Sequence, residues 1–343
     1  MTTQLDCSIG LKAEDTYGTA VVVDQFPEFT EETLDWAATF AQGAGLRVAS
    51  RVARSGRRPT TPVKQMMSGD FTVEACTSGL GILLNAALGT VTNTVTNEGG
   101  TSYQQVHTPT TDDYLGSYTI QKGVPPLGGG DADAYTFAGS QCQSIEFACP
   151  NADLVTIKTT WQGQSVDTST DYATPSYASS QDLFTFAQGA ITIGGSVTAP
   201  TTTAIASGGT SVADIRDFDL TWDNGLDQNG FNFGGAGQRS RASAVGLSAL
   251  TGTLTAEYDA TTMRDALLDQ TDLALVLTFT GAQIESGHDS VLQIYVPCLR
   301  LNTELPKSNA GDVIVQSMSF TGLDNLTADS PLYVVYVTAD TTV

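Results

Sequence analysis

The chain has 343 residues, of which 41% are hydrophobic, so it is long enough for two domains or one large β domain and can bury a core. Its 37 acidic and 15 basic residues give a net charge of −22, which excludes a protein that grips DNA phosphates over its whole surface. Two histidines exclude a multi-histidine metal site, and five cysteines without a C-x2-C pair argue against zinc knuckles and a disulfide framework. We therefore expect no metal and no cofactor.

Residues 1–10 lack the basic start and the apolar run of a secretory signal. No apolar run approaches the eighteen residues that a membrane-spanning helix needs. We expect a soluble chain that is made in a cytoplasm and has no membrane partner.

The composition is typical of an all-β architecture with few helices, because glycine, proline and threonine separate short alternating apolar runs. The predicted strands, in chain order, lie at 68–75, 153–161, 190–197, 218–222, 250–257, 273–280, 291–296, 312–320 and 332–338. Only two stretches are predicted to be helical, and each follows a strand that a glycine begins.

The first of these strand and helix pairs lies at 69–88. The strand Gly69–Glu74 alternates apolar and polar residues, as a half-buried strand does. Residues 77–88 carry one apolar stripe and stop at Gly89, a residue suited to ending a helix. The stripe consists of Leu80, Leu83, Leu84, Ala87 and Leu88.

The second pair follows the first at an offset of 183 residues. The strand Gly252–Glu257 leads to Asp259, a good helix N-cap, and to a helix with Met263, Ala266 and Leu267 directed inward. The equal offset of strand and helix predicts an internal repeat.

The similarity continues on both sides of each pair. Upstream, residues 34–36 match 220–222, and a long loop follows each; downstream, 145–163 matches 299–322. Chance similarity within a threonine-rich chain is the alternative explanation. We interpret the pattern as two copies of one unit, with a first domain at 1–170, a second at 171–343, and an insertion at about 90–135 in the first.

Three segments resemble the tail tube (major tail) proteins of long-tailed phages. They are the opening GLKAEDTYGTA at 10–20, the arginine-rich loop that follows, and the run from Ser68 to Gly89. The detailed resemblance covers about the first 90 residues, and the remainder fits through the internal repeat.

This resemblance implies a fold and a role. The expected fold class is mainly β, with two tandem tail-tube-like β-sandwich domains, each with one short α-helix on the outside. The inner sheets of neighbouring chains would form a shared β-barrel in a ring. The chain would be a virion protein that polymerises into stacked rings, three chains with pseudo-sixfold symmetry in each, forming a conduit for DNA ejection. Further expected partners are the tape measure, tail terminator and distal tail proteins, with assembly in the host cytoplasm.

Basic residues gather in one loop, since no acidic residue occurs between Asp35 and Asp70. We predict that this cluster and the matching loop of the second half contact the next ring, because arginine binds carboxylates with two hydrogen bonds. The predicted contact residues are Arg47, Arg51, Arg54, Arg57, Arg58, Lys64, Arg239 and Arg241. The alternatives are a solvated loop and weak, salt-sensitive DNA binding.

Strand alternation predicts which side chains line a lumen. If Phe71 and Val73 face the core, the residues between them face the lumen or the solvent. The predicted lumen-facing residues are Asp70, Thr72, Glu74, Thr253, Thr255 and Glu257. An acidic wall would let viral DNA pass without specific binding.

We expect no enzyme. Cys142 and Cys149 have no histidine near them in sequence, and the acidic pair at 131–133 lacks the twelve-residue EF-hand spacing. The glycine-rich stretches 128–130 and 234–237 lack the Lys-Ser/Thr ending of a phosphate loop. The alternative function is a β-sandwich binding module of a viral surface or receptor-binding fibre.

Overall fold

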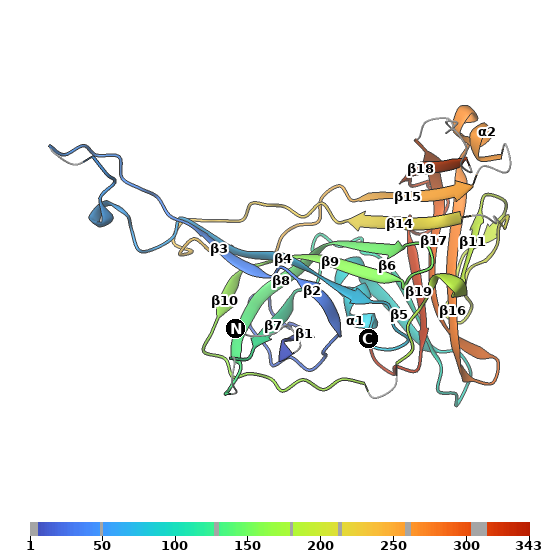
Figure 1. Cartoon of the computed structure of the whole chain (residues 1–343), viewed down its shortest axis with the longest axis horizontal. Helices are drawn as coiled ribbons and strands as arrows, with labels where there is room; N and C mark the ends of the chain where they lie inside the picture. The colour runs from blue at the N-terminus through green and yellow to red at the C-terminus, as the bar shows by residue number, and fades with distance from the viewer. Residues whose placement is uncertain are drawn as a thin grey trace.

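The computed structural model describes residues 6–48, 51–126, 130–178, 181–211, 215–257, 262–302 and 314–343. It is mainly β, and seventeen of the described strands are hydrogen-bonded into one continuous antiparallel array (Figure 1). This array divides into two large sheets, which are joined at residues 299–301 and 320–322, and a smaller sheet against the first half. The predicted N-cap Asp259 lies outside the described residues.

The first large sheet, called the long sheet here, carries the strands that the repeat predicts. In order across the sheet it contains β2 (Phe29–Glu32) with β3 (Asp35–Thr39), β4 (Lys64–Glu74), β9 (Thr156–Gly163), the second half of β8 (Asp133–Cys149), β14 (Ile215–Asp223), β15 (Ala249–Glu257) and β18 (Val315–Gly322). Within one chain this sheet is open and does not close into a barrel.

The second sheet packs against the long sheet. In order it contains β5 (Gly89–Val95), β6 (Tyr103–Pro109), β19 (Tyr333–Thr338), β17 (His288–Leu301), β16 (Leu273–Glu285) and β11 (Gly189–Ile193). The N-terminal sheet contains β1 (Ser8–Ala13), β7 (Tyr118–Val124), the first half of β8, and β10 (Ser165–Asp167). The remaining elements are β12 (Val197–Thr198), β13 (Ser207–Gly208) and the 3-10 turns η2 (Ser55–Arg57) and η3 (Phe186–Gln188).

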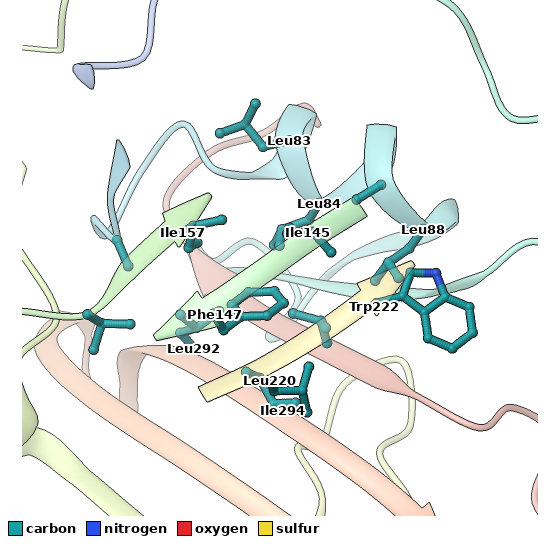
Figure 2. Close-up of a cluster of buried hydrophobic side chains, with 14 of the residues drawn as sticks. Leu83, Leu84, Leu88, Ile145, Phe147, Ile157, Leu220, Trp222, Leu292 and Ile294 are labelled. Carbon is teal, nitrogen blue, oxygen red and sulfur yellow. The ribbon is translucent and has the colours of Figure 1, made fainter. Parts of the chain in front are cut away.

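The two helices differ in burial. Seven of the eight residues of α1 (Gly81–Leu88) are buried, so the stripe predicted for 77–88 is too narrow and α1 is not on the outside. Figure 2 shows Leu84 and Leu88 of α1 directed toward Ile145 and Trp222 of the long sheet. The second helix, α2 (Thr262–Asp269), is more exposed.

The inward side of α2 is the predicted one. Ala266 is buried, and Met263 and Leu267 pack against the core. Leu268, on the other side, is 62% exposed.

Two blocks of the long sheet pair their strands in the same register. Gly69 of β4 lies opposite Trp161 of β9, and Gly252 of β15 lies opposite Phe320 of β18. Every described pair of β15 and β18 follows the corresponding pair of β4 and β9. The alignment of 69–74 with 252–257 made from the sequence is therefore also the alignment of their hydrogen-bond partners.

The tryptophan strands also share a register. Trp36 of β3 lies opposite Met67, and Trp222 of β14 lies opposite Leu250. The offset that relates Gly69 to Gly252 also relates Met67 to Leu250. Thus β2 and β3 together occupy in the first block the place that β14 occupies in the second.

An irregularity occurs at the same step in both blocks. The register shifts between Phe29 and Glu31 where β2 pairs with β4, and between Ile215 and Asp217 where β14 pairs with β15. Each shift admits one unpaired residue, as a β-bulge does.

The leading glycines have one steric reason in common. A Cβ on Gly69 would lie 2.5 Å from the carbonyl oxygen of Thr33, and a Cβ on Gly252 would lie 2.4 Å from that of Asp219. Only glycine allows the neighbouring backbone to approach so closely.

Candidate functional site

One face of the long sheet is polar along its whole width. Phe71 and Val73 of β4 and Leu254 of β15 are buried against the core. The side chains between them are half-buried on the opposite face, as the alternation predicts. They are the six residues predicted from the sequence, Asp70, Thr72, Glu74, Thr253, Thr255 and Glu257.

This polar face is acidic. Cross-strand pairing brings further carboxylates to it from β2, β3, β8 and β14. The carboxylates on the face are Glu31, Asp35, Asp70, Glu74, Glu146, Asp217, Asp219, Asp223 and Glu257. The cations Lys158 and Arg216 form ion pairs with Asp70 and Glu257. The remaining carboxylates give the face a negative potential.

The local contacts set the charge of individual carboxylates. Partial burial raises the pKa of Asp70, but hydrogen bonds from Thr33 and Lys158 outweigh it and hold the pKa below its usual value. Lys158 Nζ lies 2.9 Å from Asp70 Oδ2. Asp219 differs, because burial raises its pKa more than the hydrogen bonds from Thr253 lower it.

The basic loop extends far from the body of the molecule. Residues 40–63, called the arginine arm here, leave the sheet between β3 and β4 and reach the far left of the view (Figure 1). Near its tip, Leu46 is 99% exposed, Val48 is 96% exposed and Val52 is 79% exposed. A projecting segment with bare aliphatic side chains is typical of a surface that another protein covers.

In the part of the chain that the structure describes, the predicted contact residues of the arm make only weak contacts. Arg54 donates to the carbonyl oxygen of Gly45 over 3.2 Å, and the guanidinium of Arg58 lies 4.7 Å from the centre of the Phe40 ring. In the described part of the chain, no carboxylate pairs with any of the five arm arginines, Arg47, Arg51, Arg54, Arg57 and Arg58.

The matching loop of the second half, residues 224–248, lies against the base of the arm. The backbone N–H of Gln65 donates to the carbonyl oxygen of Gly237 over 2.7 Å, and Lys64 Nζ lies 4.8 Å from the centre of the Phe231 ring. The arm and this loop therefore leave the sheet at the same end.

Unlike the arginines of the arm, the two arginines of this loop have strong partners within the chain. Arg239 is 2% exposed, donates to the carbonyl oxygen of Asp227 and to Ser243 Oγ, and has a pKa lowered by burial. Arg241 Nη2 lies 2.6 Å from Asp227 Oδ2. Both side chains hold the loop 224–248 together.

Metal binding and thiol chemistry have little support in the described residues. They contain no group of three or more His, Cys, Asp or Glu side chains placed to hold a metal ion. Burial raises the pKa of Cys149 to about 11, so this thiol is protonated at neutral pH. Among the described helices, none has the length and apolar character that crossing a membrane requires.

Sequence reasoning missed two features of these surfaces. The exposed aliphatic residues of the arm, Leu46, Val48 and Val52, passed unnoticed beside the arginines. The strands β2 and β3 were noticed only through Trp36, and the edge that no other described strand pairs with was not noticed. The spacing of Leu46 and Val48 in a segment without acidic residues was a signal that could have identified the first feature.

A family model described as phage tail tube protein matches residues 4–322. Among curated proteins, no significant match to the chain was found. Because the family model covers nearly the whole chain, the chain belongs to the phage tail tube protein family. It is therefore a structural tail tube protein and a virion component that associates with itself to build a tube.

Proposed function

We propose that this tail tube protein polymerises into stacked rings that form a conduit for viral DNA. The observation that carries the proposal is the junction between the two blocks of the long sheet. Trp222 of β14 pairs with Ile145 of β8, and Leu220 pairs with Phe147. This junction joins the strands of the first half, β2, β3, β4, β9 and β8, to those of the second without a break.

The chain offers the same edge again to a neighbour. The strands β2 and β3 correspond to β14, and among the described strands only β4 pairs with them. Their other edge carries Trp36 at the position of Trp222. An unpaired strand edge is a template for pairing with another chain, and a ring removes such edges altogether.

The shared registers support a ring of three chains. If 1–170 and 171–343 are two copies of one unit, each chain contributes two equivalent blocks, and three chains give pseudo-sixfold symmetry. The equal position of the bulge and of the leading glycines is the support for duplication. A head-to-tail interface of this kind closes when its rotation divides the full circle.

The polar face of the long sheet would line the conduit. Its carboxylates repel DNA phosphates, so the genome can move without being held. The arginine arm would contact the next ring, together with the loop 224–248. The tape measure, tail terminator and distal tail proteins would complete the tail after assembly in the host cytoplasm.

Electron microscopy of the purified protein in negative stain tests this proposal. We expect stacked rings with a repeat of about 40 Å, the height of a domain about ten strand residues tall. Cross-sections should show six lobes that alternate between two shapes. A compact, discrete oligomer without stacking would instead indicate a binding module of a viral fibre and would refute the proposal.

The arginine arm is tested by replacing Arg51, Arg54, Arg57 and Arg58 with serine. We expect an unchanged urea midpoint, because these side chains are in a projecting arm, and a large loss of tube length. A matched control replaces Arg264 and Arg300, on the body of the protein, with serine. Tubes of normal length and salt resistance in the arm variant would remove the axial role of the arm.

A further inference from the structure

A pocket lies at the end of β4 opposite the arginine arm. The arm joins β4 at Lys64, whereas Val73, Glu74 and Cys76 line a cavity of about 190 Å³ at its other end. The eleven residues of β4 separate the two features by about 35 Å. The arm and the pocket are therefore at opposite ends of the same strand.

The pocket combines acidic groups with an apolar lining. Its carboxylates include Glu28, Glu74 and Asp340, and no described lysine or arginine forms an ion pair with any of these three. Its apolar lining includes Phe26, Leu80 and Leu183. Asp24 also lines it but is paired with Lys12 over 2.6 Å.

The lining suits an arginine side chain. The guanidinium group can bind carboxylates with two hydrogen bonds, while the three methylene groups of the side chain cover apolar surface. An aliphatic neighbour of the arginine would add buried apolar area. Within the described part of the chain, no basic group occupies the pocket in this way.

We propose that this pocket receives the tip of the arginine arm of a second copy of the chain in the next ring, an inference that rests on the proposed function. Arg47 and Arg51 are both exposed, and no described carboxylate forms an ion pair with either guanidinium group. They flank the exposed Val48. The arm tip therefore has the two kinds of group, cationic and aliphatic, that the pocket complements.

Placement at opposite ends makes the contact repeatable. A copy stacked head to tail brings its arm to the pocket of the copy before it, and leaves its own pocket for the next arm. Such a heterologous contact does not close on itself and therefore builds a filament of any length. Charge complementarity also excludes the reverse stacking, which would bring two arms together.

Cysteine crosslinking tests the assignment. In the full chain, Glu28→Cys combined with Arg51→Cys should yield a ladder of covalent oligomers on non-reducing gels after mild oxidation of tubes. The matched control, Ser317→Cys with Arg51→Cys, places the partner cysteine on the polar face and should yield no ladder. Both variants carry Cys76→Ser, because the native Cys76 lines the same pocket and could itself crosslink to the arm. A ladder that forms equally in the control would overturn the assignment.

Charge exchange gives a second measurement. Glu28→Arg alone and Arg51→Glu alone should each reduce the pelleted tube mass at least about tenfold, and the double variant should recover most of it. The pocket assignment would be overturned if the wild-type protein forms tubes, Glu28→Arg forms as many, and the cysteine variants do not crosslink. That result would leave the proposed function intact. A wild-type protein that forms no tubes would refute the proposed function itself.

Discussion

The arginine arm and the loop 224–248 leave the same end of the long sheet at corresponding positions, but they differ in how their arginines are bound. The arginine arm, after β3, projects from the body, and its arginines have no described carboxylate partner. The loop 224–248, after β14, lies on the base of the arm, buries Arg239 and pairs Arg241 with Asp227. The two loops differ in acidic residues, because the arm has none and the loop 224–248 has Asp227.

This difference shows how two similar blocks can take separate tasks. The strands keep the same register, bulge and close backbone contact, because the sheet must pair continuously through both blocks. The loops are free of that constraint. One of them stabilises the chain from within, and the other carries arginines that no described carboxylate pairs with, as the proposed contact with the next ring requires. Predictions for the shared strands should therefore agree between the two halves, and predictions for the loops should not.

The largest effect on stability is expected at the two leading glycines. We expect Gly69→Ala and Gly252→Ala each to lower the free energy of unfolding by about 3 kcal/mol, because the new Cβ would overlap a carbonyl oxygen. Urea denaturation of the unassembled chain measures it. Gly56→Ala is the control, since no atom lies within 4 Å of its added Cβ. A large cost at one glycine and none at the other would break the correspondence of the two blocks.

A smaller, pH-dependent effect is expected at His107 in β6. Its side chain is fully buried, and burial lowers its pKa from 6.5 to about 3. Between about pH 3 and pH 6.5, His107 therefore binds a proton in the unfolded chain but not in the folded chain. Stability is complete above pH 6.5 and falls as the pH drops, by about 2 kcal/mol from pH 7 to pH 5.

His107→Gln tests this titration, because glutamine does not titrate. The variant should lose less stability than the wild type between pH 7 and pH 5, as measured by the urea midpoint at each pH. Equal losses in wild type and variant would show that His107 is not the titrating group.

The strands were the part of the fold best predicted from sequence. All nine predicted strands overlap observed ones, because period-two alternation follows from a sheet with one buried face. The strands that were missed include β1, β5, β6, β7 and the first half of β8. Their buried positions include polar residues such as Gln105, Thr119 and Gln121, which hydrogen bonds within the fold satisfy and which hide the alternation.

The candidate surfaces were predicted in part for a similar reason. The outward orientation of Asp70 and Thr253 follows from alternation alone. The burial of Arg239 could not be predicted, because it depends on contacts with Ser243 and Phe231 that bring together residues of an irregular loop. The pocket was also out of reach, since Glu28, Glu74 and Asp340 are far apart in sequence.

The smallest effect is expected where the two blocks differ on the polar face. Asp70 and Lys158 form an ion pair in the first block, and the corresponding positions in the second are Thr253 and Ser317. Asp70→Thr with Lys158→Ser should cost less than about 1 kcal/mol in low salt, because the side chains of the pair are 26% and 41% exposed. High salt should abolish the difference.

The pH dependence of this pair has a defined sign. The pKa of Asp70 is lowered, so its contribution is present above the usual carboxyl pKa of 3.8 and is lost as the pH falls through the folded value. The reverse exchange, Thr253→Asp with Ser317→Lys, should be equally small, because it builds the same pair on the same register. A cost well above 2 kcal/mol for either exchange would mean that this ion pair holds one block together in a way the other does not need, and that equal register does not make the two blocks equivalent.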